Sequence, residues 1–280
     1  MQSPTPPAGL DATPLATPLA TPLAAPRASP VDSSHAATRR APPRLHHPEP
    51  LALGAIVSLG EAARRHAAAL RLARADEVTL FCGDGDEYRA ELIELSKRAM
   101  TAKVHERRPI DRESPLAMTL VQGICAADRM DWVIQKATEL GVQTIQPVIT
   151  TRTVVRLSTD RQERREQHWL AVAIAACEQC GRNRIPTIAP ILKLDQWIAT
   201  DARPGLRLQL DPLATQRLGD LPRAGALTLA VGPEGGLTVD ERDLLRSRSY
   251  VGIQLGPRVL RTETAPLAAI AALQSLWGDA

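Results

Sequence analysis

The sequence predicts an α/β protein in which a helix-covered parallel sheet follows a small β-rich domain. Three observations lead to this fold class. From residue 116 onward, strand-like and helix-like segments alternate, which is typical of a parallel sheet covered on both faces. Residues 44–110 instead carry a series of short strand-like segments. Near the C-terminus, two strand-like segments each end in a Gly/Pro turn, which favours loops that approach a ligand through backbone.

The bulk composition is that of an ordinary globular protein. The chain has 280 residues, 44% of them hydrophobic and 23% charged, with a net charge of +3 and a pI near 8.8. This mild basicity permits a nucleic-acid partner but does not argue for one. Aromatic residues make up only 2%, too few for an extended stacking platform.

Neither a membrane segment nor a metal site is expected. No apolar stretch is long enough to span a bilayer, and the N-terminus lacks the pattern of a secretory signal, so we expect a cytoplasmic protein. Cys177 and Cys180 have CxxC spacing, but no second CxxC or paired His completes a zinc site. We expect these two to be reduced thiols on a helix.

The N-terminal part divides into a tail and a β-rich domain. In residues 1–43, Thr-Pro-Leu-Ala recurs at 13, 17 and 21, and we expect this stretch to be disordered. In the domain over residues 44–110, Gly83-Asp84-Gly85 predicts a hairpin turn. A helix is expected over residues 61–73, and a linker over 108–115. The strands are expected over residues 55–59, 77–82, 88–95 and 99–106.

The domain over residues 111–280 carries the alternating pattern. Gly141 is placed as the left-handed stop of a helix, and Thr238 with Glu241 has the spacing of a capping box. Strands are expected over residues 117–124, 144–148, 206–210, 226–231 and 251–255. Helices are expected over residues 130–140, 162–180, 240–247 and 265–277.

The two C-terminal loops carry most of the functional information. The first, residues 231–236, has neither the Gly-Lys-Ser/Thr of a P-loop nor the Gly-x-Gly-x-x-Gly of a dinucleotide site. Taken alone, it could equally be a tight strand-to-helix turn. The second, residues 255–262, again ends a strand in Gly-Pro. Two such loops at the carboxyl ends of neighbouring strands mark the usual ligand position of an open α/β sheet.

These loops closely resemble the signature loops of the RsmE family, the 16S ribosomal RNA uracil-N3 methyltransferases of the SPOUT superfamily. Segments 129–132, 135–141 and 175–182 are further matches, and residues 44–48 are similar to an Arg-x-x-His-Pro segment of that family. The resemblance covers residues 44–280 in order. Two departures stand out. Ala126-Ala127 replace a Lys-Gly-like pair, removing a positive charge near RNA, and His46 stands where an aromatic residue is usual.

The resemblance implies a PUA-like RNA-binding β-barrel followed by a SPOUT domain with a C-terminal trefoil knot. It implies S-adenosylmethionine as cofactor, a homodimer, and 16S ribosomal RNA in the small ribosomal subunit as substrate. Backbone groups of the two loops would contact the cofactor. The candidate cofactor-binding residues are Val231, Gly232, Pro233, Glu234, Gly235, Gly236, Leu255, Gly256, Arg258, Leu260, Arg261 and Thr262.

Methyl transfer to uracil N3 requires that the nitrogen be positioned and lose its proton. Arg152 and Arg261 are candidates for stabilising the uracil anion, and Glu234 and Glu263 are candidate proton acceptors. A structural salt bridge or a capping role is the alternative for each. Because N3 takes part in base pairing, the target uridine must be unpaired or extruded. The candidate RNA-binding residues are Arg44, Arg129, Arg152, Arg156, Glu178, Gln179 and Arg182.

Two other functions stay open at this point. The chain could be a non-catalytic RNA-binding or ribosome-assembly factor that keeps the fold, which cofactor binding would test. It could also be a related SPOUT methyltransferase acting on another RNA or on ribose, which mapping the methylated nucleotide would test.

Overall fold

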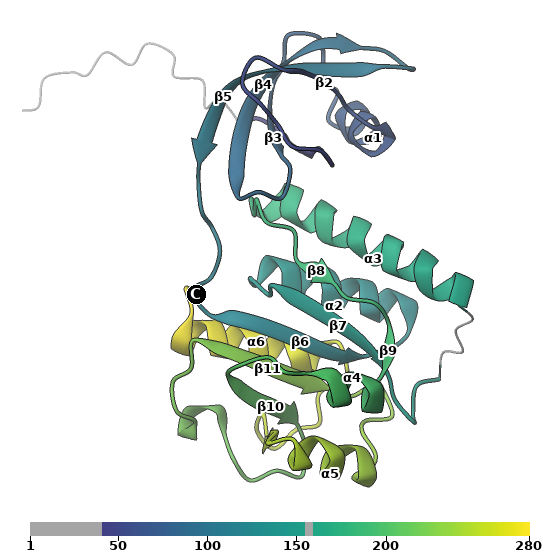
Figure 1. The fold of residues 1–280 in the computed structure, drawn as a ribbon, viewed down its shortest axis with the longest axis vertical. Helices are drawn as coiled ribbons and strands as arrows, with labels where there is room; N and C mark the ends of the chain where they lie inside the picture. Colours follow the sequence, from purple (N-terminus) through teal and green to yellow (C-terminus); the bar gives the residue numbers. More distant parts are fainter. Residues whose placement is uncertain (1–40, 155–158) are drawn as a thin grey trace, which may run out of the picture. The chain divides into compact units, whose positions relative to one another are not determined.

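A computed structural model describes residues 41–154 and 159–280 of the chain (Figure 1). These residues form one five-stranded and one seven-stranded sheet. Most of the predicted tail, residues 1–43, and the candidate RNA contact Arg156 lie outside the described residues. Pro42–Ala280 forms a single compact unit. None of the helices in the described ranges is long and apolar enough to cross a membrane.

The first sheet is built mainly from antiparallel neighbours. Its strand order is β1-β3-β4-β5-β2, and only the β1–β3 pair is parallel. The predicted hairpin turn joins β3 to β4, with φ of +91° at Gly83 and +104° at Gly85, values that favour glycine. Leu45, Leu80 and Leu92 are fully buried in its core beside the helix α1. Its elements are β1 (Arg44–His46), β2 (Ile56–Ser58), α1 (Glu61–Ala69), β3 (Glu77–Phe81), β4 (Asp86–Leu95) and β5 (Met100–Pro109).

The second sheet confirms the predicted parallel arrangement. Its order is β12-β10-β11-β6-β7-β8, with the short β9 also beside β7, and every pairing is parallel. Its central strands are runs of buried residues, as expected where both faces are covered. The strands are β6 (Ala117–Gly123), β7 (Thr144–Ile149), β8 (Thr187–Ile188), β9 (Leu192–Lys193), β10 (Leu206–Leu210), β11 (Ala226–Val231) and β12 (Val251–Ile253).

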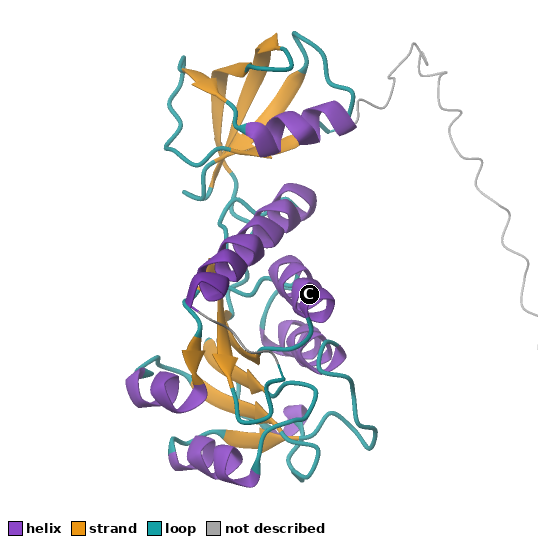
Figure 2. Cartoon of the chain, turned by 90° about the vertical axis from the view of Figure 1, so that its right-hand side faces the viewer, coloured by secondary structure: helices purple, strands orange, loops and turns teal. Residues whose placement is uncertain are grey.

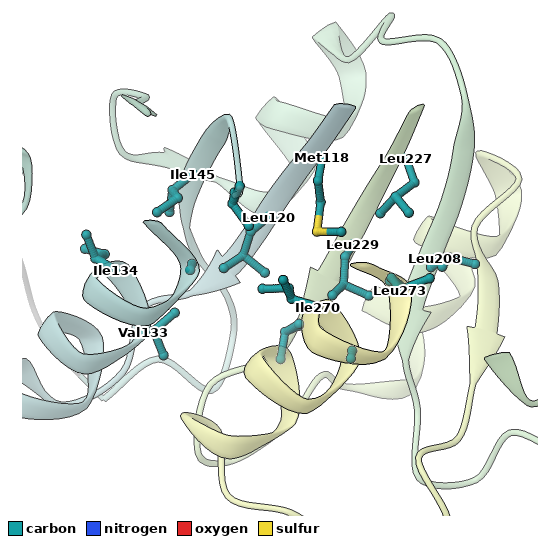
Figure 3. Close-up of a cluster of buried hydrophobic side chains, with 14 of the residues drawn as sticks. Met118, Leu120, Val133, Ile134, Ile145, Leu208, Leu227, Leu229, Ile270 and Leu273 are labelled. Atoms are coloured by element: carbon teal, nitrogen blue, oxygen red, sulfur yellow. The ribbon is translucent and has the colours of Figure 1, made fainter. Parts of the chain in front are cut away.

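Helices cover both faces of this sheet (Figure 2). On one face, Leu120 and Leu229 belong to a large core that includes Ile270 and Leu273 of α6 (Figure 3). On the other face, Val121 and its neighbours pack with residues of α4 and α5. The helices are α2 (Ala127–Glu139), α3 (Thr159–Cys180), α4 (Leu194–Thr200), η1 (Leu218–Asp220), α5 (Val239–Ser247) and α6 (Thr264–Trp277).

Local signals set several boundaries as predicted. Gly141, with φ of +82°, follows the end of α2. The capping box is present at α5, where the Glu241 N–H donates to the Thr238 hydroxyl at 3.2 Å and the Thr238 N–H donates to Glu241 at 2.8 Å. Cys177 and Cys180 lie on α3 as free thiols, as expected.

Other boundaries differ from the predictions. The helix expected over residues 61–73 ends at Ala69, and Arg71, with φ of +56°, lies outside helical conformation. The predicted linker begins later, because β5 continues to Pro109. α2 begins at Ala127, three residues before the predicted start at Met130. The short elements β1, β8, β9, α4 and η1 were not predicted.

Candidate functional site

The main cavity lies at the carboxyl ends of β10 and β11, where open α/β sheets usually bind ligands. Its volume is about 590 Å³, within the range of pockets that hold small organic ligands. It is lined by Arg129, Arg152, Leu210, Asp211, Pro212, Leu213, Val231, Gly232, Pro233, Glu234, Gly235, Gly236, Leu237, Arg242, Val259, Leu260, Arg261, Thr262 and Ala265.

The first loop, residues 231–236, is folded tightly against the end of β6. The N–H of Gly236 donates to the Pro233 carbonyl at 2.8 Å, and Gly236 has φ of +66°. A Cβ atom on Gly123 would lie 2.6 Å from both Cδ and N of Pro233. The close approach between β6 and this loop therefore requires glycine at position 123.

The second loop, residues 255–262, forms another part of the same wall. Leu255, Gly256 and Arg258 line a smaller hollow of about 60 Å³, which shares Leu260 and other residues with the main cavity. The structure therefore brings every predicted cofactor-binding residue to one of two neighbouring cavities. That these residues contact a cofactor stays a prediction.

Arginines dominate the charged lining of the main cavity. Arg152 Nη1 donates to the Gly235 carbonyl at 2.7 Å, which fixes the guanidinium beside the first loop. Arg261 is exposed at the cavity wall. Arg129 Nη1 lies 3.2 Å from Oε1 of Glu234, and its Nε lies 3.8 Å from Oε2 of Glu263. Arg129 thus joins α2 to a carboxylate of the first loop and to Glu263, which directly follows the second loop.

The two candidate proton acceptors have different surroundings. Glu234 lines the cavity, and its Oε1 accepts the backbone N–H of Ala126 at 2.8 Å. This contact gives a partner, from a distant loop, to the backbone N–H of the residue just before α2. Glu263 precedes α6 and does not line the cavity. Its Oε2 is buried and accepts no hydrogen bond from the described residues.

Cys125 lies directly behind these carboxylates and is fully buried. Burial, followed by the charge of Glu234, raises the pKa of its thiol to about 12. Cys125 is therefore a protonated, structural thiol at neutral pH.

Sequence reasoning missed several lining residues of the cavity, among them those at and just after the end of β10. Asp211 is buried there, and its Oδ2 lies 3.1 Å from Arg246 and 3.7 Å from Arg242. An Asp-Pro pair directly after a strand was the available signal. The missed lining residues are Leu210, Asp211, Pro212, Leu213, Leu237, Arg242, Val259 and Ala265.

Arg44 and Arg182, two of the candidate RNA contacts, have partners inside the protein. Arg182 is 4% exposed, forms an ion pair with Glu113, and donates to the carbonyls of Thr138 and Val142. Arg44 pairs with Glu87 at 2.6 Å, and burial lowers the pKa of its guanidinium. These contacts give both arginines a structural role.

The remaining candidate RNA contacts lie on α3 or in the cavity. Glu178 accepts the backbone N–H of His46 at 3.0 Å and contacts the His66 ring, whereas Gln179 is exposed. Arg129 and Arg152 lie in the main cavity. Among residues 41–154 and 159–280, no group of three or more His, Cys, Asp or Glu residues is placed to hold a metal ion.

Comparison with protein families places this arrangement among RNA-modifying enzymes. A family model described as an RNA methyltransferase domain matches residues 112–274. The ribosomal RNA small subunit methyltransferase E of Buchnera aphidicola (subspecies Schizaphis graminum) is 30% identical over 85% of this chain and 97% of its own length. The protein of the same name from Bacillus subtilis is 30% identical over 73% of this chain and 83% of its own length.

Two solved structures share the fold over most of the chain. The ribosomal RNA small subunit methyltransferase E of Neisseria gonorrhoeae, bound to S-adenosyl methionine, superposes with a TM-score of 0.82. It is 42% identical and covers 85% of this chain and 99% of its own. A putative methyltransferase from Legionella pneumophila, in complex with the cofactor SAM, gives a TM-score of 0.83 at 35% identity. This match covers 86% of this chain and 100% of the other.

Proposed function

Because the chain belongs to the ribosomal RNA small subunit methyltransferase E family, we propose that it methylates N3 of a uracil in 16S ribosomal RNA, using S-adenosylmethionine. The observation that carries this proposal is the meeting of two glycine-containing loops in one cavity of about 590 Å³. A cavity of this size whose wall includes Gly232, Gly235 and Gly236 suits a flat, polar cofactor, because backbone N–H and C=O groups exposed there can recognise adenine and ribose.

Bound S-adenosylmethionine would supply an electrophilic methyl group, so the protein must position the uracil and remove its N3 proton. Arg152 and Arg261 line the cavity, where their charges would stabilise negative charge on the uracil oxygens. The bond from Arg152 to Gly235 supports this role, because it holds the guanidinium in place before substrate binds.

Glu234 and Glu263 are the proposed alternatives for the proton acceptor. Glu234 lines the cavity, but a backbone N–H and Arg129 already engage it. Glu263 has a buried oxygen that accepts no hydrogen bond from the described residues. It lies outside the cavity lining, so a proton from a substrate in the cavity would have to travel past that lining to reach it. Single-turnover rates of E234Q and E263Q, measured as a function of pH, distinguish the two candidates. The variant that has lost the base no longer shows the fall in rate at low pH that protonation of the base causes.

The proposed RNA surface extends from the cavity to the start of α3. Arg129, Arg152 and Arg261 form its part in the cavity, and exposed Arg161 and Arg164 continue it along α3. Arg161, Arg164 and Arg261 are exposed and could contact phosphate, whereas Arg44 and Arg182 are paired inside the protein.

We also infer three features from family membership. The N-terminal sheet would be a PUA-like RNA-binding barrel, the chain around the cavity would form a trefoil knot, and two copies would form a homodimer. We further propose a cytoplasmic location, because the proposed substrate is a ribosomal subunit. Light scattering of the purified protein measures the oligomeric state directly.

The reaction is tested with labelled S-adenosylmethionine and small ribosomal subunits from cells that lack their own uracil-N3 enzyme. Mass spectrometry of the digested RNA locates the product. The proposal expects 3-methyluridine in 16S RNA. Cofactor binding without transfer to these subunits would indicate another RNA substrate. Absence of cofactor binding would instead indicate a non-catalytic RNA-binding factor.

A further inference from the structure

A short chain of hydrogen bonds connects the two cofactor loops behind the cavity wall. Gln122, on β6, is fully buried, and its Nε2 donates to the Gly123 carbonyl at 3.0 Å and to the Thr262 hydroxyl at 3.4 Å. The hydroxyl of Thr262 in turn donates to the Gly232 carbonyl at 2.9 Å. Three segments far apart in the sequence therefore meet in one network.

The donor and acceptor groups involved determine which atom donates in each of these hydrogen bonds. The Gly123 carbonyl only accepts, so the amide nitrogen of Gln122, rather than its oxygen, must face it. The Thr262 oxygen therefore accepts from Gln122, and its single proton goes to Gly232. With that proton used and the residue 7% exposed, the Thr262 hydroxyl is not free to donate to a ligand.

The contact between Thr262 and Gly232 is the main connection between the loops. Among the described residues, it is the only hydrogen bond that joins residues 231–236 to residues 255–262. At 2.9 Å it is well formed, whereas the 3.4 Å contact from Gln122 is longer than the usual range. We therefore expect Thr262 to have the larger effect and Gln122 a supporting one.

Gln122 also has an unsatisfied group. Its Oε1 is buried and has no hydrogen-bond partner among the described residues. A buried acceptor without a partner costs stability, so an apolar side chain of similar size would be tolerated at least as well by the core alone. Core packing alone therefore does not explain an amide at position 122, whereas its hydrogen bond to Thr262 of the second loop does.

We propose that Thr262 and Gln122 are positioning residues that hold the two loops at the separation the cofactor requires. The inference rests on the proposed function, since it takes S-adenosylmethionine as the ligand. On this proposal, Thr262 holds the Gly232 carbonyl in place and does not itself bind the cofactor, although the sequence predicted it as a cofactor contact.

The test compares T262V, which replaces the hydroxyl with a methyl group of similar size, with T262S, which keeps the hydroxyl. Calorimetry measures the Kd for S-adenosylmethionine of the full-length protein and each variant. We expect T262V to weaken binding about tenfold, equivalent to about 1.4 kcal/mol, and T262S to remain within about twofold of the unmodified protein. Rescue by serine distinguishes loop placement from simple loss of packing.

A double-mutant cycle tests the connection to Gln122. Q122M should weaken binding less than T262V, and the double variant should lose less affinity than the two single losses combined, because both act through the same network. T262V binding with an unchanged Kd, or T262S binding as weakly as T262V, would overturn the inference.

The unmodified protein is measured first, which separates the two proposals. If it binds S-adenosylmethionine and T262V binds equally well, the positioning role fails and the proposed function stands. If the unmodified protein binds no cofactor, both the proposed function and this inference fail.

Discussion

Replacing Gly123 by alanine tests whether the close packing of the first loop on β6 sets the shape of the cavity. The added Cβ would lie 2.6 Å from two atoms of Pro233 and 2.9 Å from the carbonyl carbon of Gly232. Ordinary contact begins at 3.4 Å, so about 0.8 Å of movement is needed. The obstacle is backbone and a proline ring, neither of which can rotate away, so the loop itself must shift.

The size of the effect follows from that shift. Overpacking of this kind typically costs about 1–3 kcal/mol of stability. Displacement by close to 1 Å in a ligand site costs up to about 100-fold in function. We therefore expect G123A to bind S-adenosylmethionine about 10- to 100-fold more weakly in calorimetry, with a lowered Tm.

Gly225 offers a matched control for this variant. It lies just before β11, and a Cβ there would meet no atom within 4 Å. G225A should therefore keep both Tm and cofactor affinity. If G123A also keeps its Tm and binds within about twofold of the unmodified protein, the loop is not held by this contact and the reasoning is refuted.

Three further predictions concern the cavity and the buried charges. R152A should keep cofactor affinity and slow single-turnover methyl transfer about 100-fold, as expected for loss of a fixed charge at a developing anion; an unchanged rate removes Arg152 from the mechanism. R182A should lower the free energy of unfolding by about 3–5 kcal/mol, because it leaves Glu113 without its buried partner; denaturant unfolding measures this, and a loss below about 1 kcal/mol contradicts it. Burial raises the pKa of Cys125 and of Cys177 from 9.0 to about 12, so the folded state keeps both protons when the unfolded chain has lost them. Stability should therefore fall as pH rises from about 9 toward 12, and both thiols should resist alkylation at pH 8 until the protein unfolds; rapid labelling of either in the native protein argues against this.

The sequence predicted best those elements whose signals are local. The strands Leu206–Leu210, which alternates Leu with polar residues, and Ala226–Val231, which is mostly apolar, were predicted to the residue, since both are bounded by turn-forming Gly and Pro. The stop at Gly141 follows from the same kind of signal. The two-residue strands β8 and β9 and the seven-residue helix α4 are too short to show a period, so they were missed.

In the site, loops marked by Gly and Pro could be identified, but long-range partners could not. Arg44 and Arg182 carry the charge expected of RNA contacts, and nothing in the sequence reveals that Glu87 and Glu113 lie beside them. Likewise, Glu234 accepts the N–H of Ala126, just before α2, from more than a hundred residues away. Such pairings arise only when the sheet assembles, so the fold class was predictable while the division of arginines between structure and RNA was not.

The order of strands in the parallel sheet also sets the time at which the protein becomes functional during its own synthesis. The cavity wall begins at Arg129 and is completed by Ala265, close to the C-terminus. Its central strands, β6 and β11, come from distant parts of the chain, and such non-local pairings form slowly. Because a chain is made from its N-terminus, β6 is synthesised while the lining residues from Leu210 to Ala265 are still missing. The cavity is therefore complete only after the chain has been made through Ala265.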